Sequence, residues 1–261
     1  MDLQLKGKIA LVTGSTAGIG LAIATSLAGE GAIVYVNGRK QERVDAAIAE
    51  IKKTHPNADL RPLAADLSKA DGCDAAIKAL PAVDILVNNL GIFEIVEFAK
   101  ISDADWFRFF ETNVMSGVRI SRAYFDGMLK KNWGRIVFIS SESGYMTPKE
   151  MIHYGFTKSA QIAIARGLAE LTAGSAVTVN TVLPGPTHSE GLEDFVKSMG
   201  SNDVKAFEEE FFKTARPGSL IQRFLTVKEI GDTVAYVCSP LASGINGAAI
   251  RNEGGLLKSA F

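Results

Sequence analysis

The sequence predicts an α/β fold in which seven parallel strands form a doubly wound sheet covered by helices on both faces. Short runs rich in β-branched residues alternate with longer amphipathic segments, as in βαβ units that build a parallel sheet. Most runs lack the polar alternation of a half-exposed strand, so helices should cover both of their faces. The expected strands are residues 8–13, 33–37, 59–64, 85–88, 135–140, 177–183 and 248–251.

Length and composition favour a single domain over residues 1–261. Hydrophobic residues make up 47% of the chain, enough for a sizeable core without disulfide or metal staples. The net charge of -1, without a basic block, argues against a nucleic-acid partner. Residues 1–8 lack an apolar signal segment, and no apolar run approaches the ~18 residues of a membrane helix. We therefore expect a cytoplasmic protein without a membrane partner.

The cysteines give no sign of a disulfide or a metal site. Cys73 and Cys238 are far apart in the sequence and form no C-x-x-C pair. Both are expected to be buried, reduced and inert, and no metal is expected.

The alternation of strands and helices breaks between Gly185 and Pro217. Two helical patterns replace a short connection there, and we interpret residues 186–217 as an insertion that forms a substrate lid. Each pattern has one apolar face, which either encloses an apolar substrate or packs the lid against the body. The residues of these faces are Leu192, Phe195, Val196, Met199, Phe207, Phe211 and Phe212, and the expected pocket also includes Phe93, Tyr145, Met146 and Met151.

A glycine-rich turn follows the first expected strand, at Thr13-Gly14-Ser15-Thr16-Ala17-Gly18-Ile19-Gly20. Such a turn brings backbone N–H groups and a helix N-terminus against a pyrophosphate, as in a Rossmann-like site. The spacing differs from G-x-G-x-x-G, and a P-loop lysine is missing. The alternative is a turn that only lets the helix pack closely on the strand. The candidate cofactor-binding residues here are Gly14, Ser15, Thr16, Gly18, Ile19 and Gly20.

The end of the second strand bears on the choice between two cofactors. A Rossmann-like site binds the adenosine ribose there, about 20 residues beyond the glycines. The segment Val36-Asn37-Gly38-Arg39-Lys40 has no acidic residue for a free 2′-hydroxyl, whereas Arg39 could pair with a 2′-phosphate. NADP(H) is therefore favoured over NAD(H). Alternatively, Arg39 and Lys40 are solvated charges that open a helix.

Tyr154 and Lys158 lie four residues apart in an expected helix, so their side chains share one face. A nearby ammonium lowers the pKa of a tyrosine, which makes the pair a candidate acid–base group. The same spacing also occurs by chance. Ser141 follows an expected strand at the edge of the sheet where ligands bind in open α/β folds.

Several motifs together resemble the ordered motif set of the short-chain dehydrogenases/reductases. They span nearly the whole chain and comprise the glycine-rich turn, Asn88-Asn89-Leu90-Gly91, Asn113, Ser141, Tyr154, Lys158 and Pro184-Gly185. This resemblance implies an NAD(P)(H)-dependent oxidoreductase that interconverts a ketone or aldehyde and an alcohol by hydride transfer. Among the substrates it allows are 3-oxoacyl compounds, steroid-like ketones and aryl ketones.

The resemblance also implies a role for each catalytic residue. Tyr154 would be the general acid in reduction and the base in oxidation, and Ser141 would hold the same carbonyl oxygen. Lys158 would lower the tyrosine pKa and hydrogen-bond the nicotinamide ribose. Asn113 would hold a water that links Lys158 to solvent.

Further cofactor contacts follow from the same resemblance. Asp66 and Leu67 would contact the adenine, although Asp66 could instead cap a helix before Ser68. Leu90 stands where the family usually has alanine, which predicts a displaced backbone or a narrowed pocket beside the nicotinamide ribose. The remaining implied contacts are Asn88, Gly91, Tyr154, Lys158, Pro184, Gly185 and Thr187, with Ser189 as the alternative to Thr187.

Two alternatives to a reductase or dehydrogenase remain open. One is a nicotinamide-dinucleotide-sensing binding protein without turnover, which would not need a matched acid–base set. The other is a family epimerase or dehydratase that recycles a bound cofactor, for which the expected lid is short.

The neighbours of the catalytic residues and the surface complete the expectations. His153, adjacent to Tyr154 in an expected helix, should be structural, and no G-x-S-x-G surrounds Ser141 as in a hydrolase. The resemblance implies a homo-oligomer, a tetramer or dimer packed through residues 106–129 and 152–171. Residues 256–261 would then reach a neighbouring subunit, although a frayed terminus is the ordinary expectation.

Overall fold

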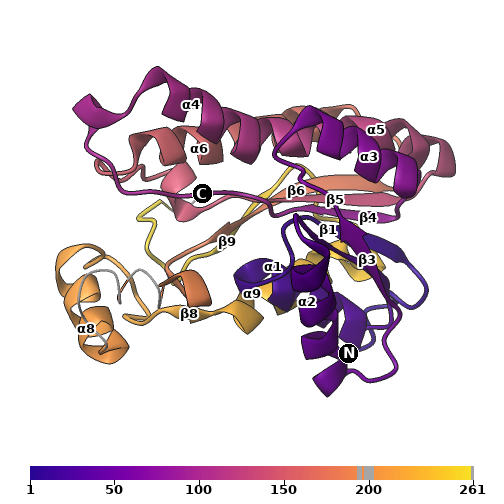
Figure 1. Ribbon diagram of the computed structural model, residues 1–261, viewed down its shortest axis with the longest axis horizontal. Helices are drawn as coiled ribbons and strands as arrows, with labels where there is room; N and C mark the ends of the chain where they lie inside the picture. Colours follow the sequence, from indigo (N-terminus) through magenta and orange to yellow (C-terminus); the bar gives the residue numbers. More distant parts are fainter. Residues whose placement is uncertain (193–195, 197–202, 260–261) are drawn as a thin grey trace.

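A parallel sheet of seven strands forms the centre of the computed structural model, which describes residues 1–192, 196 and 203–259 (Figure 1). The strand order is β3-β2-β1-β4-β5-β6-β9, so the predicted fold class is confirmed. Every predicted strand end lies within one residue of the observed one. The strands are β1 (Ile9–Val12), β2 (Ile33–Gly38), β3 (Leu60–Ala64), β4 (Ile85–Asn88), β5 (Gly134–Ile139), β6 (Val177–Pro184) and β9 (Ala249–Asn252).

Helices cover both faces of this sheet (Figure 1). One layer contains α1 (Gly18–Gly29), α2 (Gln41–Thr54) and α9 (Val227–Cys238), and the other contains α3 (Ala70–Ala79), α5 (Ser116–Lys131) and α6 (Ile152–Glu170). Helix α4 (Asp103–Phe110) continues into α5 through a π-helical turn at Glu111–Met115. Short 3-10 turns lie at Phe98–Lys100, Glu142–Gly144 and Pro240–Ala242.

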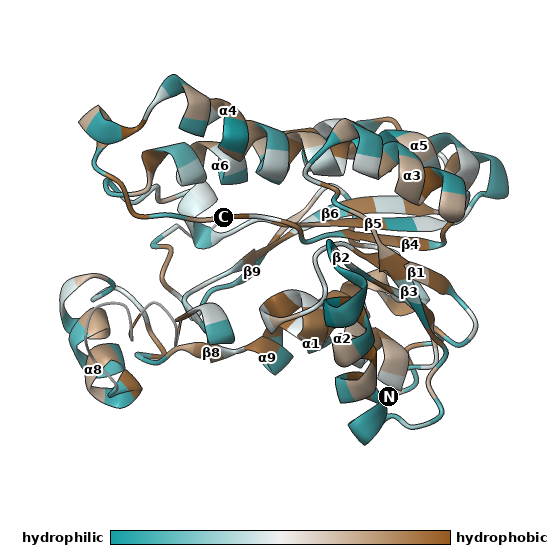
Figure 2. Ribbon diagram, in the orientation of Figure 1, coloured by the Kyte–Doolittle hydropathy of each residue, from teal (hydrophilic) through white to brown (hydrophobic). Residues whose placement is uncertain are grey.

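The sheet divides the apolar core into two clusters, because successive strand residues point to opposite faces. In β1, Ala10 and Val12 belong to the cluster beneath α1, α2 and α9, whereas Leu11 belongs to the one beneath α3, α5 and α6. Every residue of β4, β5 and β6 is buried, as expected for central strands covered on both sides. Figure 2 shows hydrophobic colour in parts of this sheet, next to more hydrophilic patches.

The insertion that the sequence predicts to be a substrate lid starts and ends at a small second sheet. β7 (Thr187–His188) pairs in parallel with β8 (Leu225–Thr226), so the insertion runs from residue 189 to residue 224, beyond the predicted end at Pro217. Within it, α8 (Val204–Thr214) stands apart from the main sheet in Figure 1. Of the predicted apolar faces, Val196 and Phe212 are buried, while Phe195 and Met199 lie outside the described residues.

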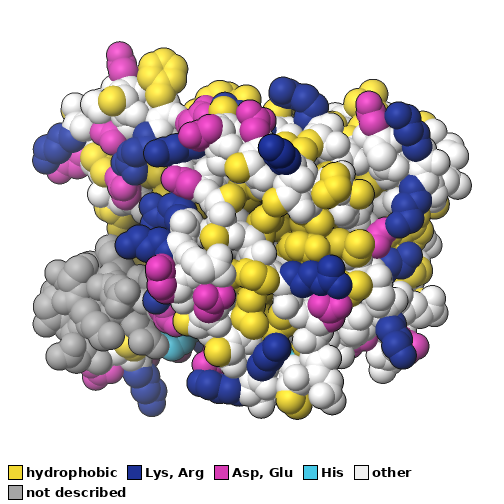
Figure 3. All heavy atoms as spheres, turned by 45° about the vertical axis from the view of Figure 1, so that its right-hand side comes forward, with side chains coloured by type: hydrophobic (Ala, Val, Ile, Leu, Met, Phe, Trp, Pro, Cys, Tyr) yellow, Lys and Arg dark blue, Asp and Glu magenta, His cyan; other side chains and the backbone are white. Residues whose placement is uncertain are grey.

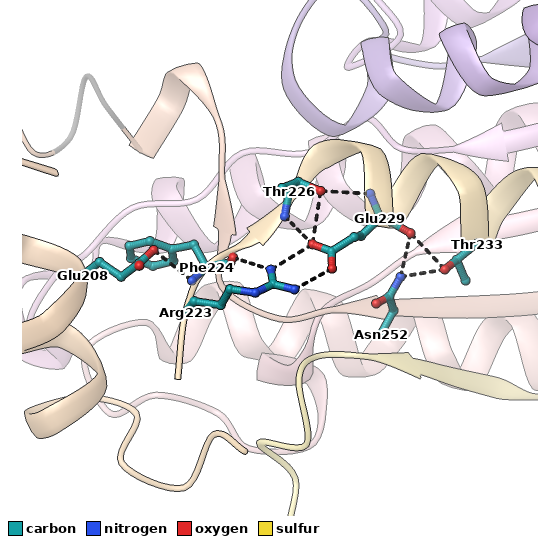
Figure 4. Close-up of polar contacts among 7 residues, drawn as sticks. All are labelled: Glu208, Arg223, Phe224, Thr226, Glu229, Thr233 and Asn252. Carbon is teal, nitrogen blue, oxygen red and sulfur yellow. Dashed lines mark hydrogen bonds and ion pairs between the residues drawn. The ribbon is translucent and has the colours of Figure 1, made fainter. Parts of the chain in front are cut away.

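The end of the lid is fixed to the body at the start of α9. Thr226 and Glu229 form a capping box there, and Arg223 makes a two-pronged ion pair with the Glu229 carboxylate (Figure 4). The backbone N–H of Phe224, the residue directly before β8, donates to the Glu208 carboxylate at 3.0 Å, and this bond connects the start of β8 to α8. The lid therefore returns to the sheet through a well-bonded segment.

The cysteines, the surface charges and the helices can be described for the part of the chain that the structure covers. Cys73 and Cys238 are free and buried as predicted, and burial raises the pKa of their thiols to about 11 and about 12. Acidic and basic side chains are interspersed on the face shown in Figure 3, which presents no continuous basic surface. Among the described helices, none is long and apolar enough to cross a membrane. In the same part of the chain, no group of His, Cys, Asp and Glu side chains could hold a metal ion.

Candidate active site

A pocket of about 660 Å³ opens at the carboxyl ends of the strands. The strand order reverses between β1 and β4, and ligands of open α/β sheets bind at such a reversal. The pocket brings together more than half of the predicted site residues. Those that line it are Gly14, Gly18, Ile19, Gly20, Gly91, Ser141, Tyr154, Lys158, Pro184, Gly185 and Thr187.

The glycine-rich turn has the backbone geometry that such a phosphate cradle needs. Gly14 and Gly18 adopt φ values of +60° and +55°, a region that favours glycine. A Cβ on Gly20 would lie 2.4 Å from both the Gly14 carbonyl oxygen and Asn89 Nδ2. Helix α1 begins after Ala17 without a side-chain cap, so its first N–H groups remain available for an anion. These features fit a dinucleotide pyrophosphate.

Ser15 and Asn37 lie behind this turn. The Ser15 hydroxyl donates to the Val12 carbonyl and accepts from the Asn37 N–H, and the Ser15 N–H donates to the Asn37 carbonyl. The Asn37 side chain accepts from the Gly14 N–H and donates to two carbonyls at the end of β3. Both polar groups of Ser15 thus already have protein partners, so Ser15 supports the turn from within the sheet.

Asn89 is a site residue that sequence reasoning did not single out. Its side-chain amide donates to the carbonyls of Thr13 and Gly14 at 2.9 and 3.0 Å, and the Thr13 hydroxyl accepts from the N–H groups of Asn89 and Leu90. This network joins the end of β4 to the glycine-rich turn. Leu90, the departure from the family pattern, lines the pocket against Gly14.

The residues predicted to bind the adenosine half of the cofactor lie outside this pocket. Arg39 is exposed just beyond the end of β2. Thr16 packs closely on Gly38, because a Cβ added to Gly38 would lie 2.5 Å from the Thr16 methyl group. Asp66 accepts from the N–H and hydroxyl of Ser68 in a turn before α3, whose N-cap is Lys69, so the helix-cap alternative is wrong. Predicted site residues that do not line the pocket are Ser15, Thr16, Arg39, Asp66, Leu67, Asn88 and Asn113.

Tyr154 and Ser141 meet in the pocket from two different elements. Ser141 lies between the end of β5 and the 3-10 turn at Glu142–Gly144, and Tyr154 lies in the first turn of α6. Burial and the Glu142 carboxylate raise the pKa of Tyr154, and a hydrogen bond with Ser141 counteracts this only in part. The expected lowering of this pKa is therefore not found. Tyr154 is held in the protonated form, which suits an acid.

Lys158 lies next to Tyr154 but is itself buried. Its Nζ is 5.5 Å from the centre of the Tyr154 ring and donates to the Ile139 carbonyl at 2.8 Å. Burial lowers the pKa of Lys158 to about 7, although the Glu142 carboxylate opposes the shift. A lysine that is partly neutral near pH 7 offers less charge to lower the tyrosine pKa, which explains the difference from the expectation.

Asn113 lies behind Lys158, in the π-helical turn between α4 and α5. Its side chain exchanges hydrogen bonds with the backbone of Ile92 and donates to the Thr157 hydroxyl at 3.0 Å. Its backbone carbonyl accepts from Gln161 Nε2 at 2.6 Å, and Gln161 Oε1 accepts from Lys158 Nζ at 3.3 Å. Gln161 is a second residue that sequence reasoning missed, and it connects Asn113 to the lysine.

The sequence predicts a structural role for His153 and a place in the pocket wall for several other side chains. His153 is fully buried, with its ring centre 4.1 Å from that of Phe109, and burial lowers its pKa, in line with the structural role predicted. Tyr145 and Met146 are 57% and 41% exposed and do not line the pocket, so that expectation is wrong. The pocket walls include Phe93, Met151, Leu192, Phe207 and Phe211.

The end of β6 forms the opposite wall. The Gly185 N–H donates to the Asn252 carbonyl, and a Cβ at this position would lie 2.7 Å from the Glu253 backbone, so only glycine fits. The Thr187 hydroxyl donates back to the Gly185 carbonyl at 2.8 Å. Thr187 and Ser189 both line the pocket, and either could reach a nicotinamide carboxamide.

Comparison with known proteins identifies the family. A sequence model described as short chain dehydrogenase matches residues 8–199, nearly three-quarters of the chain. The chain belongs to the short-chain dehydrogenase/reductase family. The uncharacterized oxidoreductase YvaG of Bacillus subtilis is 53% identical to this family member, and the alignment covers 100% of both chains.

More distant relatives carry names that specify a reaction. A 3-oxoacyl-acyl-carrier-protein reductase, FabG of Aquifex aeolicus, is 32% identical over 98% of this chain and 100% of its own. The crystal structure of L-sorbose reductase from Gluconobacter frateurii, complexed with NADPH and L-sorbose, superposes with a TM-score of 0.92 at 28% identity. That alignment covers 99% of this chain and 100% of the reductase. The chain is accordingly an oxidoreductase of this family.

Proposed function

We propose that the protein is an NADP(H)-dependent carbonyl reductase, an enzyme of class EC 1.1.1, that reduces a ketone or aldehyde to an alcohol. One observation carries this proposal: Ser141, Tyr154 and Lys158 line the same pocket as a glycine-rich turn with an uncapped helix N-terminus. A binding protein that only senses the cofactor has no use for an acid held protonated in its pocket. The similarity to a reductase described with NADPH supports the same cofactor class.

The pocket residues can divide the chemistry among them. A bound nicotinamide would supply the hydride. The Tyr154 hydroxyl would donate its proton to the carbonyl oxygen, and Ser141 would hold that oxygen beside it. Lys158, held by the Ile139 carbonyl, would contact the nicotinamide ribose and return a proton to the tyrosine. The second lone pair of the Asn113 carbonyl could bind the water that resupplies Lys158.

The cofactor contacts extend the same proposal. Gly14, Gly18, Ile19 and Gly20 would hold the pyrophosphate, with Ser15 and Thr16 shaping the turn. Arg39 would pair with the 2′-phosphate, because it is exposed just beyond the end of β2. The other contacts proposed are Asp66 and Leu67 at the adenine, and Asn88, Gly91, Pro184, Gly185 and Thr187 toward the nicotinamide.

We also propose a cytoplasmic homo-oligomer, a dimer or tetramer, formed through α4, α5 and α6. Phe107 is 72% exposed on α4 and Phe156 is 45% exposed on α6, and the rings of Phe110 and Phe156 stack between these helices. Exposed aromatic residues of this kind are typical of protein interfaces. Of residues 256–261, which were expected to reach a neighbouring subunit, Leu256 is buried in its own subunit, and residues 260–261 lie outside the described residues. Light scattering of the purified protein measures the oligomeric state.

The proposed function is tested by following NADPH absorbance across a panel of ketones, aldehydes and 3-oxoacyl thioesters. We expect NADPH oxidation with at least one carbonyl compound and slower oxidation with NADH. Tyr154→Phe should abolish turnover while NADPH still binds, because the change removes only the proton donor. Cofactor binding without turnover of any carbonyl compound would contradict the proposal and favour a sensor.

A further inference from the structure

A buried ion pair lies beside the catalytic serine and is not part of the acid–base set. Glu142 directly follows Ser141 and is 5% exposed, and Arg216 comes from the lid just after α8. Arg216 Nε lies 3.5 Å from Glu142 Oε1, and the two side chains are 12% and 6% exposed. Both residues line the active-site pocket. The pair therefore connects the lid to the segment that carries Ser141.

Neither charge has its hydrogen-bonding capacity filled. Glu142 Oε2 accepts from the Ser143 N–H at 2.9 Å and from the Ser141 hydroxyl, but Oε1 has only Arg216 at a distance too long for a good hydrogen bond. Arg216 Nη1 donates to the neighbouring Ala215 carbonyl, and Nε has no hydrogen-bond partner among the described residues. Buried charges are costly unless such groups are paired and hydrogen-bonded. The pair is therefore suited to a ligand that both accepts from Arg216 and donates to Glu142.

The charge of the pocket restricts what that ligand can be. Among the described lining residues, Glu142, Glu150 and Glu190 are acidic, and only Lys158 and Arg216 are basic. Burial also lowers the pKa of Lys158 to about 7, so its positive charge is weakened. A substrate with its own negative charge would meet an excess of carboxylates. A neutral molecule with hydroxyl groups would not.

We propose that Glu142 and Arg216 bind a hydroxyl group next to the reacting carbonyl, and that the substrate is a neutral polyhydroxylated ketone or aldehyde. This inference rests on the proposed reductase function and specifies its substrate class. Because the Ser141 hydroxyl donates to Glu142, the pair lies beside the place where Ser141 would hold the carbonyl oxygen once its hydroxyl turns from Glu142 to the substrate. A hydroxyl on the adjacent carbon can accept from the guanidinium and donate to the carboxylate.

The apolar part of the pocket is compatible with this substrate class. The Arg216 guanidinium lies over the Phe211 ring, 5.6 Å from its centre, which fixes the arginine in place. Phe207 and Leu192 extend the same wall and can pack on the C–H groups of a short carbon chain. The expectation of an apolar carbonyl substrate took account of these lid residues but not of the charged pair beside them.

The test compares two ketones with the same four-carbon skeleton, erythrulose and 2-butanone, with an acetoacetyl thioester as a third substrate. Hydroxyl groups by themselves make a ketone easier to reduce, so the decisive quantity is how the erythrulose to butanone ratio of kcat/KM changes in variants. In Glu142→Gln and Arg216→Lys we expect that ratio to fall about 10- to 100-fold, the effect of losing a hydrogen bond to a charged group. The matched control is Glu229→Gln, which alters the ion pair with Arg223 outside the pocket and should leave the ratio unchanged (Figure 4).

The outcomes separate this inference from the proposed function. A preference for erythrulose that falls in both pocket variants, but not in Glu229→Gln, supports the inference. An equal loss of kcat/KM for both ketones would give the pair a purely structural role and overturn it. A preference for butanone or the thioester would overturn the substrate class and leave the reductase function standing. If NADPH reduces none of the three but does reduce another carbonyl compound, this inference fails and the reductase function stands; if NADPH reduces no carbonyl compound at all, both proposals fail.

Discussion

Gln161 offers a direct test of the hydrogen bonds around Lys158, the lysine proposed to be catalytic. Its side chain is 1% exposed and donates to the Asn113 carbonyl at 2.6 Å, while its Oε1 accepts from Lys158 at 3.3 Å. Gln161→Leu removes both bonds without a large change in volume. A buried hydrogen bond contributes roughly 1 kcal/mol, and a partner left without one costs about 1–3 kcal/mol. Since the hydrogen bond to Lys158 is long, most of the lost stability comes from the hydrogen bond to the Asn113 carbonyl. We expect the free energy of unfolding to fall by about 2 kcal/mol.

The measurement is urea denaturation followed by far-UV circular dichroism, at one protein concentration because association also stabilises the fold. The matched control is Gln41→Leu, in which an exposed glutamine at the start of α2 loses a single hydrogen bond to Asp45. We expect that change to stay within about 0.5 kcal/mol of wild type. If Gln161→Leu is no more destabilising than Gln41→Leu, the bridge between Asn113 and Lys158 does not stabilise the protein, and the reasoning is refuted.

Three further predictions concern the cofactor site and the buried lysine. Arg39→Ser should raise the KM for NADPH about 10- to 100-fold and leave that for NADH nearly unchanged, since a charged hydrogen bond contributes roughly 1.5–3 kcal/mol; equal increases for both cofactors would argue against a phosphate contact. Burial lowers the pKa of Lys158 to about 7, so between pH 7 and about 8.5 the unfolded chain binds more protons at this residue. Wild type should therefore gain stability with rising pH relative to Lys158→Met, by up to about 1.4 kcal/mol per pH unit, and parallel pH curves for the two proteins would exclude this penalty. Gly20→Ala should weaken NADPH binding at least about 10-fold in a fluorescence titration, because its Cβ would lie 2.4 Å from Gly14 and Asn89 atoms; unchanged affinity would mean that the turn can open without cost.

The fold could be predicted because its signals are local. Strands β4, β5 and β6 are buried along their whole length, and the apolar runs at residues 85–87 and 136–139 show this for β4 and β5, whereas β6 also buries Thr178, Asn180 and Thr181. The two strands that were missed, β7 and β8, contain two residues each and have no pattern of their own. They form because the ends of the insertion meet in space, which is a property of the folded chain.

The candidate catalytic residues could be found by motif, but the hydrogen bonds that hold them could not. Asn89 reaches Thr13 across 76 positions, and Gln161 reaches Asn113 across 48. No local pattern records such contacts. Gln161 nevertheless left a signal, because it lies seven residues after Tyr154 and three after Lys158, on the same face of an expected helix. A polar side chain on that buried face should have suggested a partner for the lysine.

Burial also reversed one inference about chemistry. The spacing of Tyr154 and Lys158 predicted that the lysine would lower the tyrosine pKa, but this holds only if the lysine stays charged. The structure buries both groups and places the Glu142 carboxylate beside them, so the pKa of Tyr154 is raised and that of Lys158 is lowered. Desolvation depends on the whole surrounding fold and cannot be read from a four-residue spacing.

The pairing of β7 with β8 makes the insertion separable from the catalytic body. Thr187 lies opposite Leu225 and His188 opposite Thr226, so the segment between them leaves the body and rejoins it across neighbouring strands. A replacement of different length could begin and end at the same two strands without moving the glycine-rich turn or Tyr154. We therefore expect that exchange of this one segment would change substrate preference and leave the proposed machinery for hydride transfer in place.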